Sequence, residues 1–282
     1  MTAALVLTAA APLLWAALGE LLGERAGVLN IGIEGVMLVA CLAAALVAPT
    51  WGPWWGVVAA AGAGAVMNLG FAAVVAAGAD QVVAGTGLVL VGAGLSGTVF
   101  RRLQAVGALP PLLPTLPWGP LEVAPLVAAG ILMWWFGATK LGLKVRAVGE
   151  NPDAAAAAGV SPVTVRVVVL GCAGVLTGLA GATLVLRAAG SFVEGMTAGR
   201  GFLALALVML GRWRPLPVAA GALLLGAATS AQFSFQALGL GSVPYHLVLV
   251  VPYLLTLLVL AALPPGTSGS PAALGAGWRS QK

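Results

Sequence analysis

Charged and polar side chains that could do chemistry gather in three short segments of an otherwise apolar sequence. The first segment, residues 19–35, contains Glu20, Glu24, Arg25, Asn30 and Glu34. Asn30 and Glu34 are four residues apart, so a helix through them would carry both on one face. An acid inside a membrane is costly unless it is paired or faces water. The segment therefore leaves two interpretations open. In the first, the acids have a structural role only, with Glu24 and Arg25 at the membrane interface and Glu34 bound by a neighbouring group. In the second, a broken helix lies beside a translocation path.

The second segment, residues 138–166, has the residues of a short, sharply bounded helix. Asn151 suits the cap, Pro152 suits the first helical position, and Asp153 adds negative charge near the positive helix end. Five alanines favour a helix and Gly159 is a natural stop, which predicts a helix of about two turns. Since a helix this short is marginal in water, we expect the bundle or a partner protein to hold it. The alternative is a simple connecting loop.

The third segment, residues 190–215, places Glu194, Thr197 and Arg200 before a short apolar stretch at 202–210. That stretch is too short to cross a membrane as a straight helix, so it predicts a half-helix or a re-entrant segment. Its charged, glycine-interrupted start resembles the first segment. Paired broken segments in two halves of a transporter are typical of inverted repeats around a path.

The sequence lacks the motifs of catalysis, metal binding and nucleotide binding. It has no G-x-x-x-x-G-K-[ST] motif, so no P-loop for ATP is expected. Its single histidine, His246, is not part of a cluster of metal-ligating residues. The basic residues are dispersed, which argues against a nucleic-acid interface. We therefore expect no catalytic residue, no metal site and no cofactor bound by this chain.

The elements that position these segments must lie in lipid. Of the 282 residues, 61% are apolar and only 7% are charged, whereas an ordinary soluble domain carries roughly 25% charged residues. So few charges could not cover the surface of a soluble globule. We expect a single transmembrane domain over residues 1–263 and a flexible tail over residues 264–282, which is rich in Gly, Pro and Ser.

Apolar stretches of about 20 residues predict the membrane spans. The predicted spans are 3–19, 28–48, 54–77, 82–100, 121–138, 167–187, 216–236 and 245–262. Together with the partial element they predict an all-α polytopic membrane protein with about eight spans, in a range of 8–10. Tryptophans at predicted span ends suit an aromatic belt. These are Trp51, Trp54, Trp55, Trp118 and Trp213.

The Lys and Arg residues predict the orientation. With the loop 139–166 in the cytoplasm, nine of the thirteen basic residues lie in cytoplasmic loops or in the tail. Cytoplasmic loops are enriched in such residues. The amino terminus is then outside, the carboxy terminus is cytoplasmic, and the proline-rich stretch 101–120 is an external loop.

The three segments also carry a resemblance to a known family. The stretches ERAGVLNIGIEGVMLVA, GLKVRAVGENPDAAAAAGVSP and MTAGRGFLALALVMLGRWRP resemble permease subunits of bacterial ABC importers for simple sugars, nucleosides and branched-chain amino acids. Among these the chain is most similar to nucleoside-type permeases. The resemblance implies a type II ABC importer-like permease fold in a bacterial plasma (inner) membrane.

The resemblance also implies partners and a role for the short helix. In this family a coupling helix docks on a cytosolic ATP-binding subunit, which holds ATP and Mg²⁺; here it corresponds to residues 150–161. A second permease chain and a substrate-binding lipoprotein complete the implied importer. The residues expected at the coupling contact are Glu150, Asn151, Pro152, Asp153, Ala156, Gly159 and Ser161. The candidate path residues are Asn30, Glu34, Asn68, Glu194 and Arg200.

Two other classes stay open on the residues alone. A secondary transporter or channel driven by a gradient would need an intramembrane acid that titrates, and Glu34 is the best candidate. A membrane-embedded structural subunit of another complex would leave the capped short helix unexplained. The sequence does not distinguish nucleosides, sugars and branched-chain amino acids as the solute.

Overall fold

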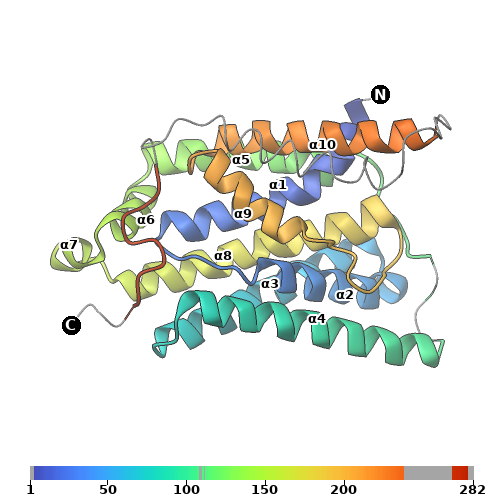
Figure 1. The fold of residues 1–282 in the computed structure, drawn as a ribbon, viewed down its shortest axis with the longest axis horizontal. Helices are drawn as coiled ribbons and strands as arrows, with labels where there is room; N and C mark the ends of the chain where they lie inside the picture. Colours follow the sequence, from blue (N-terminus) through green and yellow to red (C-terminus); the bar gives the residue numbers. More distant parts are fainter. Residues whose placement is uncertain (1–2, 108–109, 111, 238–268, 279–282) are drawn as a thin grey trace.

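The computed structural model describes residues 3–107, 110, 112–237 and 269–278, and every regular element within them is a helix (Figure 1). Seven helices are long. They are α1 (Ala3–Arg25), α2 (Ile33–Trp51), α3 (Pro53–Ala76), α4 (Gln81–Ala105), α5 (Pro120–Ala138), α8 (Pro162–Thr183) and α10 (Pro215–Ala237). The short ones are α6 (Lys140–Glu150), α7 (Pro152–Ala157), α9 (Arg200–Leu210) and the π-helix η1 (Leu184–Ala189), which continues α8.

Six of the long helices within the described residues are apolar and long enough to cross a membrane. They are α1 to α5 and the continuous helix Pro162–Ala189. The chain is therefore a multi-pass membrane protein. Helix α10 coincides with the predicted span 216–236, whereas the predicted span 245–262 lies outside the described residues. Six spans are thus found among the described residues, and the total of about eight stays a prediction.

Helices α1 to α5 and α8 run along the bundle in alternating directions, whereas α10 runs in the same direction as α8, because the short helix α9 returns the chain between them (Figure 1). Helices α6 and α7 and residues 269–278 lie together at one end, which we call the α7 end. The end of α4 and the start of α5 lie at the opposite end. The end of α4 and the start of α5 are thus separated from α6 and α7 by the length of the bundle, as the orientation argument requires.

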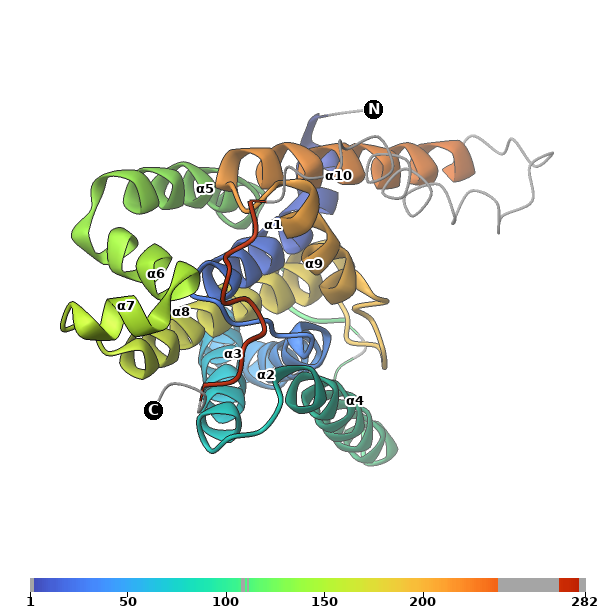
Figure 2. The ribbon, with the colours of Figure 1, turned by 60° about the vertical axis from the view of Figure 1, so that its left-hand side comes forward.

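Helix α1 lies at the centre of the bundle in both views (Figures 1 and 2). All residues from Ala10 to Glu24 are buried, so no side of this part of the helix faces the surroundings. A helix that is apolar all round needs partners on every face, and α5, α8, α9 and α10 supply them. By contrast, α4 lies at the edge of the bundle. Its exposed side chains, including Val83, Leu90 and Val91, suit contact with lipid.

Small residues allow α3 and α8 to pack with their backbones in close approach. A Cβ atom added to Gly64 would lie 2.2 Å from the carbonyl oxygen of Gly174. One added to Gly178 would lie 2.3 Å from the carbonyl oxygen of Ala60. Helices in lipid have no hydrophobic driving force to associate, so close backbone packing of this kind stabilises membrane bundles. The glycine spacing in the span 167–187 therefore serves helix packing.

Two expectations about the ends of the bundle need correction. Trp51, Trp54, Trp55 and Trp118 are exposed, as an aromatic belt requires, but Trp213 is buried, with only 6% of its surface exposed. Trp213 is held inside because its indole N–H is hydrogen-bonded to a buried acid.

The tail expected to be flexible over 264–282 is packed in its described part. Residues 269–278 run across the α7 end (Figure 2), where Ala273 and Trp278 are buried. The amide of Ala273 donates a hydrogen bond of 2.9 Å to the carbonyl of Gly149. Composition alone suggested flexibility because it does not show such contacts with residues far away in the chain.

Candidate functional site

The segment between α1 and α2, residues 26–32, is a linker without helical structure, held by side chains from outside itself. The backbone N–H of Leu29 donates to Oε1 of Gln81 at 2.7 Å, and that of Asn30 donates to Oε1 of Glu20 at 3.0 Å. Helix α2 begins only at Ile33. The chain is therefore not helical between Arg25 and Ile33, and a broken helix beside a translocation path stays a prediction. The idea that Asn30 and Glu34 share a helical face is wrong, since Asn30 precedes the helix.

Asn30 and Asn68 form one polar contact inside the bundle. The amide nitrogen of Asn30 donates to Oδ1 of Asn68 at 3.0 Å, and Asn68 donates in turn to the carbonyl of Leu170 at 3.3 Å. Both asparagines are buried, with 2% and 3% of their surfaces exposed. Buried amides need such partners. The pair thereby fixes the linker against α3 and α8.

The carboxylate of Glu34 joins the start of α2 to the start of α9. Its Oε1 accepts hydrogen bonds from the Thr197 hydroxyl at 2.5 Å and the Gly199 N–H at 2.8 Å. Its Oε2 accepts from the Gly201 N–H at 2.7 Å. Glu34 has only 6% of its surface exposed. All three partners are donors, which suits a carboxylate, a group that only accepts.

Helix termini explain why an acid is needed at this place. The first backbone N–H groups of a helix lack partners within the helix, and the helix dipole attracts negative charge there. Gly199, the N-cap of α9, has no side chain that could supply a cap, and its φ of 80° is in the left-handed region that glycine adopts readily. Glu34 supplies the missing cap for α9, while it also lies in the first turn of α2. One carboxylate thus serves the first turns of two helices.

Gly201 makes this close approach of α2 and α9 sterically possible. A Cβ atom added there would lie 2.6 Å from the backbone nitrogen of Glu34 and 2.7 Å from its Cα. No real side chain fits at such distances. We call the contact of Glu34 with Thr197, Gly199 and Gly201 the broken-helix junction.

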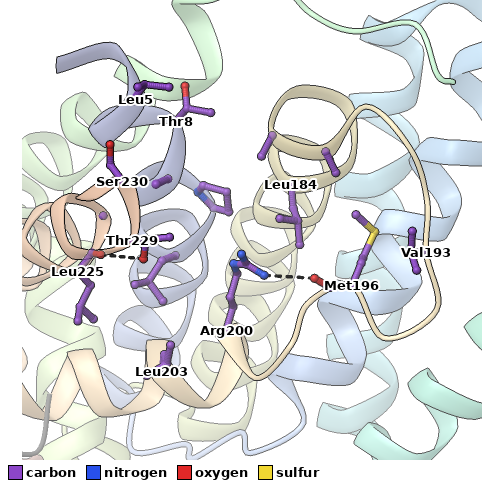
Figure 3. Close-up of a pocket in the computed structure, with 16 residues that line it drawn as sticks. Leu5, Thr8, Leu184, Val193, Met196, Arg200, Leu203, Leu225, Thr229 and Ser230 are labelled. Carbon is purple, nitrogen blue, oxygen red and sulfur yellow. Dashed lines mark hydrogen bonds between the residues drawn. The ribbon is translucent and has the colours of Figure 1, made fainter. Parts of the chain in front are cut away.

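Arg200 lies between Gly199 and Gly201 in the chain, and its side chain lines a cavity of about 420 Å³ (Figure 3). Its Nη1 donates to the carbonyls of Met196 and Thr197, both at 3.2 Å, which fixes the guanidinium. The cavity lies between α1, η1, α9 and α10, and its volume is in the range of ligand pockets, about 300–1,000 Å³. Its walls are mostly aliphatic. The polar side chains that line it are Thr8, Arg200, Thr229 and Ser230.

Glu194 is the one predicted path residue that does not belong to this group. Its carboxylate forms an ion pair of 2.9 Å with Arg101, and both side chains are largely exposed, 47% and 63%. The structure therefore brings Asn30 to Asn68, and Glu34 and Arg200 to the start of α9, but it places Glu194 at the surface. Exposed pairs of this kind contribute little, about 0–1 kcal/mol.

Three polar contacts escaped the sequence analysis. Glu24, expected at the interface, is buried and accepts a hydrogen bond from Trp213. Glu122 on α5 is buried and pairs with Arg187 on η1 at 2.5 Å. Gln81, the first residue of α4, is buried and accepts a hydrogen bond from the N–H of Leu29. The only signal for them was the presence of polar residues at the ends of apolar stretches, which does not identify a partner far away in the sequence.

The short helix predicted near Asn151 is present as α7. The Asn151 side chain accepts from the N–H of Ala154 at 3.0 Å, Pro152 occupies the first turn, and Gly159 has a φ of 81°. Asp153 and Ala156 are exposed. Helix α7 projects at the extremity of the bundle in both views (Figures 1 and 2). The cap and the stop are confirmed, while the docking role of this helix stays a prediction.

The flanks of α7 are fixed by side-chain contacts. Glu150 accepts a hydrogen bond of 3.3 Å from the N–H of Ala272. Ser161 caps α8 by accepting from the N–H of Thr164 at 3.4 Å.

The part of the chain that the structure describes contains no group of His, Cys, Asp or Glu residues that could hold a metal ion.

Comparisons with known proteins point to one class. A family model described as "Branched-chain amino acid transport system / permease component" matches residues 2–260. A Haloferax volcanii protein provisionally named as a glucose ABC transporter permease is 35% identical over 84% of this chain and 78% of its own. The guanosine ABC transporter permease protein of Bacillus subtilis is 30% identical, over 89% of this chain and 88% of its own. So is the nucleoside ABC transporter permease protein of Lactococcus lactis, with the same shares. No solved structure matches the chain.

Proposed function

Because this chain belongs to the family of permease components of branched-chain amino acid transport systems, we propose that it forms, with a second permease, the membrane path of an ATP-driven importer for nucleosides or simple sugars. The observation that carries the proposal is the extent of the similarity. Relatives named for guanosine, nucleosides and glucose are 30% to 35% identical and align over 84% to 89% of this chain. The alignments also cover 78% to 88% of these relatives, so most of their length is shared with this chain.

ATP would be hydrolysed on a separate subunit that docks at α7. The sequence has no P-loop, so the energy must arrive through a protein contact. Helix α7 projects from the bundle and exposes small residues such as Ala156, which permit close approach of a partner. We assign the contact to residues 150–161, with Asn151 and Gly159 fixing its two ends. ATP and Mg²⁺ would bind only on the partner.

The solute would pass the cavity that holds Arg200 and then the broken-helix junction. Arg200 can donate hydrogen bonds to the oxygens of a nucleoside or a sugar, and the hydroxyl-bearing side chains of Thr8 and Thr229 line the same cavity. The mostly aliphatic lining suits brief, weak binding. High affinity for the solute would then reside in a separate substrate-binding lipoprotein.

The burial and the hydrogen bonds of Glu34 favour ATP over an ion gradient as the energy source of transport. A gradient-driven carrier needs an acid that is open to the path and can exchange protons or ions. Glu34 is nearly buried, and its two oxygens accept three hydrogen bonds. It is thus engaged as a helix cap.

The proposed assembly contains two permease chains, ATP-binding subunits and the lipoprotein, in a bacterial plasma membrane. The α7 end, with residues 269–278, would face the cytoplasm. The excess of Lys and Arg in the loops at that end supports this orientation.

Purification and uptake test the proposal together. The chain, tagged and extracted from its own host in mild detergent, should copurify with an ATP-binding subunit and a second permease. Cells that lack the chain should lose uptake of labelled guanosine or glucose and regain it when the chain is restored. Loss of leucine uptake alone would instead identify an amino acid permease. Copurification of the chain without any ATP-binding protein would contradict the proposal.

A further inference from the structure

Residues 269–278 form a strap across the α7 end that touches both α6 and the linker 26–32. On the α6 side, the N–H of Ala273 donates to the carbonyl of Gly149 at 2.9 Å, and the N–H of Ala272 donates to Glu150 at 3.3 Å. Gly149 and Glu150 directly precede Asn151, the cap of α7. The strap is therefore attached immediately next to the proposed docking helix.

Two buried side chains connect the other half of the strap to the linker. Gln81, the first residue of α4, donates from Nε2 to the carbonyl of Ala276 at 2.7 Å. Its Oε1 accepts from the N–H of Leu29 at 2.7 Å. One amide group thus bridges the strap and the linker, and only 1% of the Gln81 surface is exposed.

Arg166, near the start of α8, forms the second bridge. Its Nε donates to the carbonyl of Ala26 in the linker at 3.2 Å, and its guanidinium lies 5.4 Å from the ring centre of Trp278 in the strap. Arg166 is completely buried, and Trp278 has 5% of its surface exposed. Removal from water strengthens a contact between a cation and an aromatic ring.

We propose that Gln81 and Arg166 are positioning residues that transmit movement of α6 and α7, through the strap, to the start of α2. The contacts are contiguous from Glu150 through Ala272 and Ala276 to Gln81 and Leu29. The linker that they reach leads directly into α2, whose Glu34 holds the broken-helix junction. Chains of packed side chains and hydrogen bonds can carry energetic coupling between two distant sites. This inference rests on the proposed function, because it takes α7 as the contact with the ATP-binding subunit.

The ratio of solute transported to ATP hydrolysed tests the proposal in the reconstituted complex. The variants are Gln81→Met, which removes both hydrogen bonds at similar size, and Trp278→Ala. The matched control is Trp118→Ala, which removes an exposed tryptophan that precedes the start of α5 and is not part of the strap. We expect Gln81→Met and Trp278→Ala to bind the ATP-binding subunit and hydrolyse ATP, but to move at least fivefold less solute per ATP, with an unchanged KM for the solute. The control should behave as the unmodified complex.

Three results would overturn the proposal. The first is an unchanged ratio in both variants. The second is loss of the ATP-binding subunit from them, because the strap would then belong to the docking surface. The third is an unmodified complex that transports solute without ATP, which would remove the proposed function as well. If the Gln81→Met chain does not fold and reach the membrane at all, deletion of residues 269–282 applies the same test, since it leaves the contact of Gln81 with Leu29 in place.

Discussion

Replacing Glu34 by glutamine should weaken the broken-helix junction while the chain still inserts into the membrane. The glutamine oxygen can keep the two hydrogen bonds that Oε1 accepts from Thr197 and Gly199. Its amide nitrogen, however, faces the N–H of Gly201, which now bonds to Oε2. Two donors then oppose each other, and one buried N–H stays without a partner.

The size of the effect follows from these contacts. A buried donor without a partner costs about 1–3 kcal/mol. Loss of the negative charge beside helix amino termini costs about 0.3–1 kcal/mol more for each helix served. For the two helices served, these give roughly 2–5 kcal/mol in total, which corresponds to a shift of roughly 30- to 4,000-fold in the equilibrium between joined and separated helices. Glu34→Leu removes all three acceptor contacts and should have a larger effect.

Solute uptake, measured beside membrane insertion, checks this prediction. Both variants should reach the membrane in near-normal amounts, and uptake should fall at least tenfold in Glu34→Gln and further in Glu34→Leu. The matched control is Glu194→Gln, which removes an exposed acid whose ion pair is worth about 0–1 kcal/mol; it should transport normally. Normal uptake by both Glu34 variants would refute the idea that Glu34 joins α2 to α9 for transport.

Three further predictions concern orientation, coupling and packing. Single cysteines at Ala156 and Leu112, in a chain without its two native cysteines, should react with an impermeant thiol reagent on intact cells only at position 112; labelling at 156 alone would reverse the orientation. Gly159→Val should reduce both copurification of the ATP-binding subunit and solute-stimulated ATP hydrolysis, because a β-branched residue resists the left-handed backbone at φ 81°; normal transport would make α7 a mere connector. Gly178→Val should lower the thermal stability of the detergent-extracted chain, since its side chain would meet the backbone of α3 at Ala60; an unchanged melting temperature would mean that α3 and α8 can separate at no cost.

Local features of this chain could be predicted because neighbouring residues determine them. Asn151, Pro152 and Gly159 specify the start and end of α7 within a few residues, through a cap, a fixed φ and a left-handed stop. The apolar stretches predicted the long helices for the same reason, since the length of a span and its composition are both local. The short length of α9 was predicted in the same way, because its apolar stretch at 202–210 is too short to cross a membrane.

Contacts between distant residues could not be predicted in this way. Glu34 and its partner Gly201 are 167 positions apart, and no spacing rule connects them. The segments 19–35 and 190–215 are similar in their charged, glycine-interrupted sequence. That the carboxylate of Glu34 in the first segment contacts the second depends on how α1, α2 and α8 pack. The strap was missed for the same reason. Its Gly and Pro content suggested flexibility, whereas buried contacts with Gln81 and Arg166 fix it.

The most direct test of the account is ATP-dependent uptake by the purified complex in proteoliposomes. The complex of this chain with its copurified subunits is reconstituted, and entry of labelled guanosine and of labelled glucose is measured with ATP, without ATP, and with an imposed proton or sodium gradient. The account predicts accumulation of one of these solutes only when ATP is present on the side of the ATP-binding subunit. Accumulation driven by a proton or sodium gradient in the absence of ATP would contradict it.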